Sequence, residues 1–531
     1  MSERSSNRVS FASCNSQYYE QVLWKAILAR DPSVFIWGGD TVYADVSDKD
    51  PAPPDRIEQL YKEQKLDPGY QELLSRKIPI LGVLDDHNYG INNGDRTYPY
   101  RTASGRLFAC DFLEQQGTAF CDRAKNGKGV YAVKVMDFHR PKGQELLTDE
   151  EAGLDPDVPI SVQPETNSNN PQPSVLSDRS VAIFLLDVRS NSSPITKHGL
   201  DSAHYDGDLL GEDQWKWFEA AIGKSTAAVN IVVQGIQVHT DKLASADRYE
   251  TWSNFPASQH RLYQAMLQDH VKAPILVSGD VHLAQLLRKD CQLFHHHATK
   301  QQAEPVSQSK PKMLLEVTSS GMTHSWGASW GGHICARPRS LFLCRTPHVR
   351  WAAKLGMHLG QWINGKKVWT ELVDLSSAAQ TDETMVVPAG EGKLGLQYEL
   401  NLNFGEFEFD WANKAVSIRI FGKQVDAPPL LSTRLYLDSL SGTRNDIQVA
   451  AEEDYFVETY NRLESNGGFT SNAAVDNQWI CVNYRGRHDP VSQVAGIFIP
   501  FGAGAAVAGF PFIAMILAIR RYLGRRKVKQ S

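Results

Sequence analysis

Short apolar runs recur along the chain, and each ends at a side chain that could bind a metal ion or a phosphate group. Such runs, bounded by glycine or charged residues, are typical of buried strands. In α/β proteins the loops beyond the carboxyl ends of parallel strands carry the ligand site, so the pattern predicts a single site. The runs are VSFASC at 9–14, SVFIWGGDTVYAD at 33–45, IPILGVLDDH at 78–87, VAIFLLDVR at 181–189 and PILVSGDVH at 274–282.

Between these runs, apolar residues recur at helical spacing. It predicts a crossover helix within residues 17–31 and an amphipathic helix at Asp208–Ile222. Later in the chain, Leu396–Phe404 and Phe407–Gly422 alternate in a way that predicts a hairpin turning at Gly405. Parallel strands need long crossover connections, usually helices, and the succession of strands and helices therefore predicts an α/β fold.

The residue types at the strand ends indicate metal binding. Charged groups are costly to bury unpaired, and a cluster of carboxylates repels itself unless cations neutralise it. A mixture of carboxylate, imidazole, phenolate and thiolate suits a transition metal with a second divalent cation beside it. Asp40 follows Gly38-Gly39, where aspartate is also ordinary turn chemistry, so a turn remains the alternative for that residue.

The motifs around these residues resemble the PhoD-like phosphatases (alkaline phosphatase D family) of the calcineurin-like metallophosphoesterase superfamily. The resemblance covers residues 9–422, and it implies a domain at 1–422 with a four-layer αββα sandwich of two mixed sheets. It also implies hydrolysis of phosphate mono- and diesters at a site that pairs iron with calcium or another divalent cation. The motifs are SC at 13–14, GDTVYAD at 39–45, DDHNYGINNG at 85–94, LDVR at 186–189, SGDVH at 278–282 and TSSGMTHS at 318–325.

The resemblance assigns a role to each strand-end residue. One group of residues would hold iron, and Asp40 would bridge from iron to the second cation. Asp86 and His282 would complete the second cation site. The iron ligands would be Cys14, Asp40, Tyr43 and Asp280.

Two more residues would act on the substrate. Arg189 would bind phosphate oxygens as a bidentate donor, with a salt bridge to Asp187 as the alternative. His87 would donate a proton to the leaving oxygen, or it would orient a ligand of the metal. We therefore expect a membrane-anchored, metal-dependent phosphoester hydrolase that activates water at a dinuclear site.

One position departs from the family pattern. Asn93 stands where the family usually has aspartate, which could weaken the second cation site unless Asp95 substitutes for it. The departure supports an alternative function, a membrane-tethered phosphate-ester binding protein with a degraded site. A hydrolase acting on something other than phosphate is a further alternative, which Arg189 disfavours.

Charge and cysteine content limit the partners and the cellular compartment that we expect. The chain of 531 residues has a formal net charge of -6 and no basic tract before its C-terminus, so nucleic acid is not an expected partner. If Cys14 binds metal, six cysteines remain, and we expect Cys110 with Cys121 and Cys335 with Cys344 as candidate pairs. Such pairs fit an oxidising compartment, and free buried thiols are the alternative.

Outside the motifs, composition predicts the remaining segments. Residues 141–180 are acidic and rich in Pro, Ser and Asn, which predicts a surface insertion. Residues 423–490 form an extension whose fold the sequence does not indicate. Residues 491–519 contain no charged residue and exceed the ~20 residues needed to cross a bilayer. They predict a transmembrane helix, followed by a basic tail at 520–531.

The two ends of the sequence predict opposite topologies. The basic tail favours a cytosolic C-terminus, and its KVKQS ending resembles a signal for the endoplasmic reticulum. The catalytic domain would then be luminal, in a single-pass protein whose partners are a phosphoester and the lipid bilayer. The first eight residues carry no apolar signal region, which instead favours a tail-anchored protein with a cytosolic domain. We expect the luminal arrangement.

Overall fold

The computed structural model describes most of the residues between 6 and 483. The chain divides into two compact units, Met1–Trp330 with Thr370–Arg487 and Gly331–Trp369 with His488–Ser531. All described residues belong to the first unit. They are residues 6–45, 50–159, 176–195, 206–240, 250–295, 304–306, 309–326, 328, 398–444, 449, 453–469 and 477–483.

The first of two sheets contains six strands in the order β14-β13-β12-β1-β2-β3. Its half formed by β1, β2 and β3 is parallel, whereas β12, β13 and β14 pair antiparallel with their neighbours. The strands are β1 (Arg8–Ala12), β2 (Val34–Trp37), β3 (Ile80–Gly82), β12 (Phe404–Asp410), β13 (Ala415–Phe421) and β14 (Leu431–Tyr436).

The second sheet contains nine strands, with the order β11-β8-β10-β7-β6-β5-β4 and with β9 and β15 also paired to β8. Strands β5, β6, β7 and β10 are parallel to one another. The strands are β4 (Ala132–Asp137), β5 (Ser180–Leu185), β6 (Val229–Val233), β7 (Pro274–Ser278), β8 (Ala284–His295), β9 (Glu304–Pro305), β10 (Lys312–Ser319), β11 (Tyr398–Glu399) and β15 (Asn477–Asn483).

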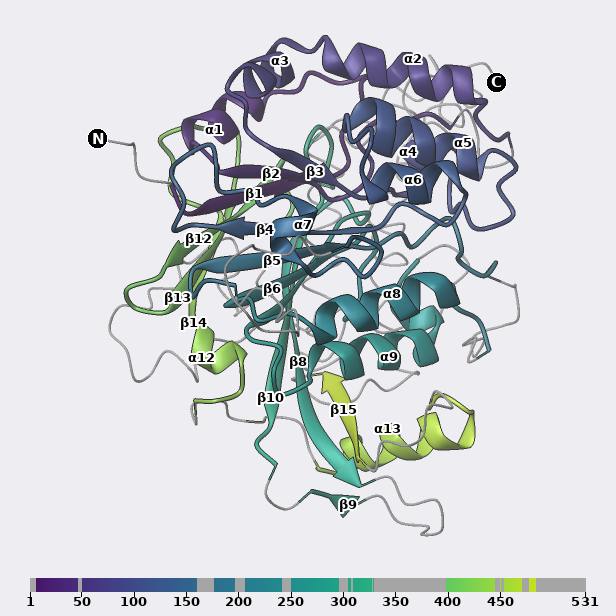
Figure 1. Ribbon diagram of the computed structural model, residues 1–531, viewed down its shortest axis with the longest axis vertical. Helices are drawn as coiled ribbons and strands as arrows, with labels where there is room; N and C mark the ends of the chain where they lie inside the picture. The colour runs from purple at the N-terminus through teal and green to yellow at the C-terminus, as the bar shows by residue number, and fades with distance from the viewer. Residues whose placement is uncertain are drawn as a thin grey trace, which may run out of the picture. The chain divides into compact units, whose positions relative to one another are not determined.

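Helices cover the outer faces of the two sheets (Figure 1). Figure 1 shows α1 to α3 over the first sheet and α8 with α9 over the second. The helices are α1 (Trp24–Ala29), α2 (Pro54–Lys65), α3 (Pro68–Ser75), α4 (Asp86–Tyr89), α5 (Arg101–Arg106), the π-helix η1 (Leu107–Phe112), α6 (Ala119–Lys125), α7 (Asp149–Ala152), α8 (Glu212–Gly223), the 3-10 helix η3 (Trp252–Asn254), α9 (Pro256–Met266), α12 (Leu437–Leu440) and α13 (Glu453–Ser465).

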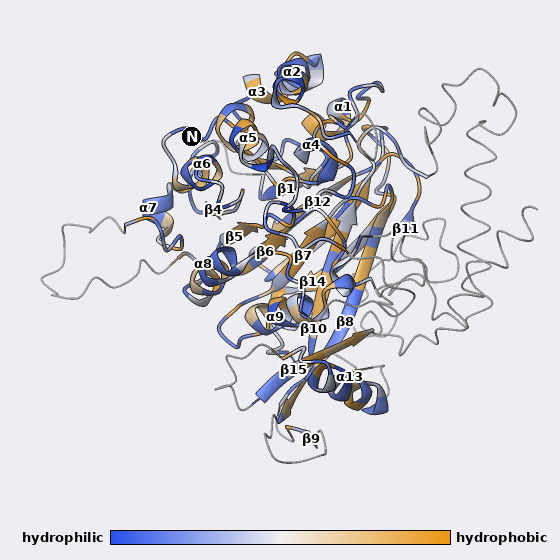
Figure 2. Ribbon diagram, turned by 90° about the vertical axis from the view of Figure 1, so that its right-hand side faces the viewer, coloured by the Kyte–Doolittle hydropathy of each residue, from blue (hydrophilic) through white to orange (hydrophobic). Residues whose placement is uncertain are grey.

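The alternation of side chains along β5 explains this layering. Successive residues of a strand point to opposite faces, and both faces of β5 are apolar. Val181, Ile183 and Leu185 belong to the core cluster that contains the strands of the first sheet. Ala182 and Phe184 pack in a second cluster with the side chains of α8 and α9. A strand buried on both faces reads as a continuous apolar run, as Figure 2 shows for β5, β6 and β7.

A hairpin is present in this region, but it is not the predicted one. Strand β12 runs through Gly405, and the chain reverses at Trp411–Lys414 before β13. These two paired strands fall largely within the second predicted arm, Phe407–Gly422, whereas the first arm, Leu396–Phe404, contains β11, which pairs with β8 of the second sheet. Gly405 is needed for packing and not for a turn, because a Cβ atom there would lie 2.2 Å from the ring of Phe11 on the neighbouring strand. The prediction was therefore wrong about both the turn and the strand pair.

Residues 423–483 contribute to both sheets. Strand β14 extends the first sheet beside β13, and β15 joins the second sheet beside β8. Helix α13 packs its buried Phe456 and Tyr460 in a small core with Phe294 of β8. The described part of this extension is thus built into the sandwich.

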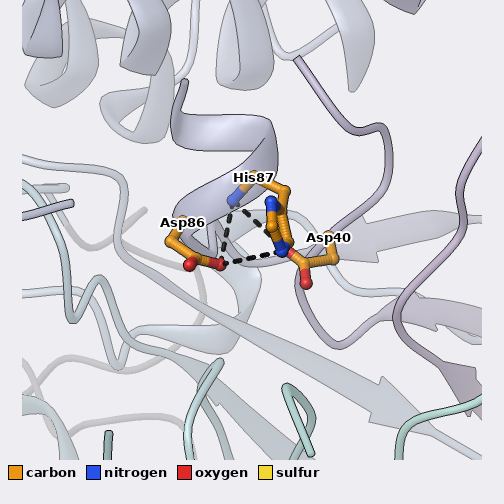
Figure 3. A group of neighbouring side chains, drawn as sticks. All are labelled: Asp40, Asp86 and His87. Atoms are coloured by element: carbon orange, nitrogen blue, oxygen red, sulfur yellow. Dashed lines mark hydrogen bonds and ion pairs between the residues drawn. The ribbon is translucent and has the colours of Figure 1, made fainter. Parts of the chain in front are cut away.

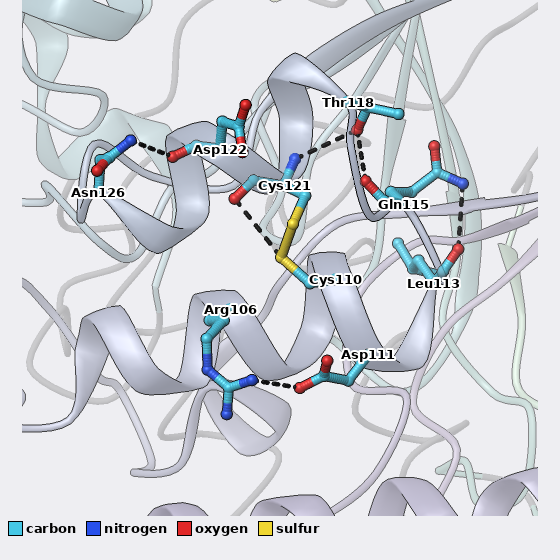
Figure 4. The surroundings of a disulfide bond; sticks show 9 residues. All are labelled: Arg106, Cys110, Asp111, Leu113, Gln115, Thr118, Cys121, Asp122 and Asn126. Carbon is cyan, nitrogen blue, oxygen red and sulfur yellow. Dashed lines mark hydrogen bonds and ion pairs between the residues drawn. A yellow bond between two sulfur atoms is a disulfide. The ribbon is translucent and has the colours of Figure 1, made fainter.

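Two disulfides stabilise the unit. Cys110 on η1 bonds to Cys121 on α6, as predicted, and Figure 4 shows the two helices that it links. The second disulfide, Cys291–Cys481, joins β8 to β15 across 190 residues of sequence and was not predicted. Cys335 and Cys344, the other predicted pair, lie outside the described residues.

The predicted membrane segment is corrected. Among the described residues, no helix is both long enough and apolar enough to cross a bilayer. The predicted transmembrane helix at 491–519 lies outside them. The fold class therefore stands as a mixed α/β fold with two sheets, and we withdraw the membrane helix, the lipid partner and the single-pass localisation from the interpretation.

Candidate metal centre

The loops after β1, β2, β3, β7 and β10 meet at one place and bring the predicted metal ligands together. The thiol of Cys14, after β1, lies 3.6 Å from Oδ2 of Asp40, after β2. The hydroxyl of Tyr43 donates to the same oxygen at 3.3 Å. Cys14 also contacts Ser320, after β10, at 3.0 Å. The structure thus places thiol, phenol and carboxylate side by side, as the sequence predicted.

Asp86 joins this group to a second set of carboxylates. Ligand atoms of Asp40, Asp86 and His87 lie within 4.8 Å of one another, and so do those of Asp85, Asp86 and Asp280. Figure 3 shows the first of these groups around the start of α4. Asp86 is the member common to both groups, whereas the predicted bridge was Asp40.

The start of α4 is fixed by hydrogen bonds to backbone groups. The backbone N–H of His87 donates to Oδ1 of Asp40 at 3.2 Å and to Oδ1 of Asp86 at 2.9 Å. The side-chain oxygen of Asn88 accepts from the backbone N–H groups of Asp40 at 3.1 Å and Asp85 at 2.8 Å. Asn88, which stands in the DDHNYGINNG motif, thus joins the loops after β2 and β3.

Two histidines line the other side of the centre. His282, after β7, donates its backbone N–H to Ser320 at 2.7 Å, and its ring lies 4.4 Å from that of His324. Nε2 of His324 lies 3.0 Å from the hydroxyl of Tyr43. Nδ1 of His282 is buried without a hydrogen-bond partner, which is a state that a bound metal ion would satisfy.

The backbone is strained where it delivers these ligands. Four non-glycine residues have positive φ, at 61° for Cys14, 49° for Asp40, 68° for Asp280 and 54° for His282. This conformation costs energy for residues with a side chain and collects at functional sites. Each of the four lies in the loop that follows β1, β2 or β7, so the strained turn redirects the side chain towards the common centre.

Burial and mutual repulsion shift the pKa values of the carboxylates. Enclosure by the protein, the largest cause, raises the pKa of Asp40, Asp85 and Asp280 above the usual range, and neighbouring carboxylates raise it further. Asp86 differs, because His87 and Arg189 outweigh the effect of burial and lower its pKa. A cluster of acids in this condition is stabilised by cations, which favour the charged forms.

The thiol of Cys14 and the imidazole of His282 are also groups that bind metal ions. Burial, followed by the charge of Asp40, raises the pKa of the Cys14 thiol, so a cation would be needed to hold it as thiolate. Burial and the charge of His87 lower the pKa of His282 to about 3. His282 is therefore neutral, which is the form of imidazole that binds metals.

Arg189 lies behind the carboxylates and binds two of them. Its Nε donates to Oδ1 of Asp85 at 2.8 Å, and its Nη1 donates to Glu250 at 2.6 Å and to the carbonyl of Gly94 at 3.3 Å. Its Nη2 donates to Asp85 as well. The salt bridge to Asp187 considered from the sequence is not formed, because Asp187 accepts from backbone N–H groups, including that of Arg189 at 2.9 Å.

The position that departs from the family pattern does not face the centre. The side-chain oxygen of Asn93 accepts from Asn92 at 3.2 Å on the surface. Asn93 contacts Asp86 through its backbone N–H, at 2.8 Å, which any residue could supply. Asp95, the suggested substitute, accepts from Thr97 at 2.7 Å within its own turn.

Glu250 and Asp45 are the functional candidates that the sequence analysis missed. Asp45 accepts from Nδ1 of His87 at 2.7 Å, and its place in the GDTVYAD motif could have indicated it. Glu250 follows no apolar run and stands in no motif. Its neighbours come from strands far away in sequence, so only the folded chain brings it to Arg189.

Comparisons with known proteins agree with the resemblance seen in the motifs. A family model described as PhoD-like phosphatase matches residues 178–356. That segment contains Arg189, Asp280 and His282, whereas Cys14 and Asp40 precede it. A solved structure titled "Structure of PhoD" is similar over 81% of this chain and 70% of its own, with 14% identity and a TM-score of 0.41. Comparison with curated proteins finds no match.

Proposed function

We propose that this chain is a metal-dependent phosphoester hydrolase with two cations at the strand ends. The match of the PhoD-like phosphatase family model to residues 178–356 supports the phosphatase class. The two-cation centre, the mono- or diester substrate and the roles of single residues are our proposal.

The proposal rests on buried carboxylate and imidazole groups that gather at one place, some of whose atoms lack a hydrogen-bond partner. Asp40, Asp85 and Asp86 are buried, and ligand atoms of Asp86 lie within 4.8 Å of those of Asp40 in one group and of Asp85 and Asp280 in the other. Oδ2 of Asp85 and Nδ1 of His282 are buried without partners. Such a cluster is costly unless cations occupy it. The donor set fits the metals that the family implies.

The donors separate into a softer and a harder side. Cys14 and Tyr43 both contact Asp40, and a thiolate with a phenolate suits ferric iron. Asp85 and Asp86 form the harder side, which suits calcium or another divalent cation. We propose that Cys14, Asp40, Tyr43 and Asp280 hold iron and that Asp86 and His282 hold the divalent cation. When bound, the pair would lower the pKa of a water and polarise the phosphoryl oxygens.

We propose that His87 donates the proton to the leaving oxygen. Its Nδ1 is held by Asp45 at 2.7 Å, which leaves Nε2 on the opposite side of the ring, 4.0 Å from Asp86. Burial alone would lower the pKa of His87, but Asp86 and Asp40 outweigh it and raise that pKa well above its usual value. A raised pKa favours the protonated imidazole, which is the form that a general acid needs.

We propose that Arg189 contributes charge at this centre. The sequence analysis assigned it a bidentate grip on phosphate, which needs two free adjacent N–H groups. Four of its N–H groups already donate to Asp85, Glu250 and Gly94. Its positive charge nevertheless lies 4.0 Å from Asp86 and so acts on the carboxylates that would hold the cations.

The binding protein with a degraded site is not favoured by any observation. Its support was Asn93, whose side chain points to the surface and away from the acids. Asp280, His282 and His87 retain partial exposure, so the centre is open to a ligand on that side. An enzyme needs this opening for turnover.

The test is hydrolysis of bis-p-nitrophenyl phosphate and p-nitrophenyl phosphate by the purified full chain. We expect activity that disappears on chelation and returns with iron and calcium together. A matched sample of Asp280→Asn should stay inactive after the same treatment. Activity that survives complete metal removal would contradict the proposal, as would metal-loaded protein that hydrolyses neither ester.

A further inference from the structure

We propose that Glu250 is a positioning residue of the metal centre, because it fixes the Arg189 guanidinium that orients Asp85 and keeps the Asp85 side of the centre negative. The inference rests on the proposed function, since it concerns the divalent-cation side of that centre. Glu250 contacts neither the predicted ligands nor any place where a substrate would react. It acts through Arg189.

The Arg189 side chain has little freedom to move. It is 2% exposed, and four of its five N–H groups donate, one to Glu250, one to Gly94 and two to Asp85. The bond to Glu250 measures 2.6 Å. Because Asp85 and Glu250 bind different nitrogens of the same planar group, the position of Glu250 determines the plane of the guanidinium and thereby its grip on Asp85.

Asp85 is closely enclosed by the backbone of two loops. A Cβ atom at Gly39 would lie 2.7 Å from the Asp85 Cβ, and one at Gly235 would lie 2.6 Å from its Cγ. Two glycines thus allow the backbone to close around this carboxylate. Its Oδ1 is used by Arg189, and its buried Oδ2 has no partner. Oδ2 is the oxygen left to act on a cation near Asp86 and Asp280.

Glu250 also sets the net charge of the group that it forms with Asp85 and Arg189. Asp85 bonded to Arg189 alone would be a neutral pair, and a neutral pair attracts a cation weakly. Glu250 carries a second negative charge and lies 2.6 Å from the guanidinium, so Asp85, Arg189 and Glu250 together have a net charge of about -1. Arg189 can therefore fix Asp85 in place without cancelling its attraction for the divalent cation.

The experiment compares calcium binding by full-length wild type and Glu250→Gln. Glutamine keeps the size and one acceptor oxygen and removes the charge. The measurement is isothermal titration of calcium at pH 8, where Glu250 is ionised, since burial raises its pKa to about 7. We expect the dissociation constant for calcium to rise about tenfold, as for other residues that support metal ligands. The visible absorption of iron should stay unchanged, because Cys14 and Tyr43 lie on the other side.

A matched control is Glu219→Gln. Glu219 accepts from Arg261 at 2.6 Å, an ion pair of the same kind between α8 and α9. We expect this variant to bind calcium like wild type. Glu250→Gln that also binds calcium like wild type would overturn the inference.

A second variant keeps the inference testable if Glu250→Gln does not fold. Glu250→Asp retains the charge but shortens the side chain, so we expect the dissociation constant for calcium to rise by less than about tenfold. A loss of about tenfold or more in folded Glu250→Asp would overturn the charge argument. Wild-type protein that binds no calcium contradicts the proposed function itself. Wild-type protein that binds calcium beside an equally competent Glu250→Gln contradicts only the role of Glu250.

Discussion

The Cys14 thiol lies 3.0 Å from the hydroxyl of Ser320, although 306 residues separate the two in sequence. Cys14 ends the first strand of the first sheet, and Ser320 follows β10 of the second. Ser320 also accepts from the backbone N–H of His282 at 2.7 Å. One hydroxyl thus joins the two sheets at the place where both deliver metal ligands, so the centre depends on how the sheets pack.

We expect Cys14→Ser to change the colour of the purified protein. A thiolate or a phenolate bound to ferric iron gives a visible charge-transfer band, and replacing the sulfur removes its part of that band. The measurement is the visible spectrum of iron-loaded protein, together with turnover of bis-p-nitrophenyl phosphate, which should fall.

The control for Cys14 lies on β1, the strand that precedes it. Ser10 is buried on β1, and its hydroxyl lacks a partner, so Ser10→Ala should leave the spectrum unchanged. If the wild-type protein is colourless and fully active, the assignment of iron to the centre is wrong.

Asp40→Asn and Asp280→Asn should each lose bound metal. An amide has no charge to offset that of the cation, and loss of one ligand should lower turnover at least about a hundredfold, the upper range seen for supporting residues. The melting temperature should also fall, because metal that binds only the folded chain stabilises it. Metal content by mass spectrometry is the measurement.

Asp426→Asn is the matched control for these two variants, because Asp426 is an exposed residue in the connection between β13 and β14. It should keep the metal content and the turnover of wild type. Full metal occupancy in Asp40→Asn or Asp280→Asn would identify those aspartates as turn residues.

The strand ends were predictable from sequence because their signals are local. An apolar run that stops at Gly38-Gly39 and delivers Asp40 contains the strand, the turn and the ligand within a few residues. The convergence of such ends follows from the geometry of parallel strands. Grouping Cys14 with Asp40 and Tyr43 needed the resemblance to a family as well.

The features that sequence analysis missed all depend on contacts between distant segments. Gly405 looked like a turn, and only the ring of Phe11 explains a glycine in that strand. Cys291 and Cys481 are 190 residues apart, and nothing near either one indicates its partner. Glu250 has no local signal, because its role comes from Arg189.

His87→Gln should affect poor leaving groups more than good ones. A general acid contributes most when the leaving oxygen is basic, so hydrolysis of an alkyl phosphoester should fall about 10²–10⁴-fold. Hydrolysis of a p-nitrophenyl ester should fall much less, because p-nitrophenolate leaves without a proton. The measurement is the dependence of rate on leaving-group pKa for both proteins.

The variant Asp45→Asn tests whether His87 donates a proton or only orients the metal ligands. It keeps a polar partner for Nδ1 of His87 at the position now 2.7 Å away and leaves the ring in place. We expect a smaller loss than for His87→Gln, with the same preference for good leaving groups. Equal losses for all leaving groups in His87→Gln would show that His87 only orients the metal ligands.

The last prediction concerns acid stability and the ion pair between Arg123 and Asp155. Nη2 of Arg123 lies 2.7 Å from Oδ2 of Asp155, and the two side chains are 4% and 2% exposed. The indole N–H of Trp217 donates to the same carboxylate at 2.9 Å. The pair joins the loop after α7, in the described part of the segment 141–180 that was predicted as a surface insertion, to α6.

The sign of the pH effect follows from the pKa of Asp155. Burial alone would raise that pKa, but the hydrogen bond and charge of Arg123 outweigh it and lower the pKa below the usual value. A lowered pKa in the folded state contributes stability that is complete above the unfolded value of about 3.9. That stability is lost as the pH falls through the folded value.

Asp155→Asn should therefore destabilise the protein at neutral pH and reduce its sensitivity to acid. Removing one member of a buried pair leaves the other uncompensated and costs about 3 kcal/mol, although Asp157, 2.9 Å from Arg123, retains part of the interaction. Urea unfolding between pH 7 and pH 2 measures both effects. The difference in unfolding free energy between wild type and Asp155→Asn should be constant above about pH 5 and should shrink below about pH 4. A difference that stays constant down to pH 2 would show that the carboxylate contributes through its shape and its hydrogen bonds, and not through its charge.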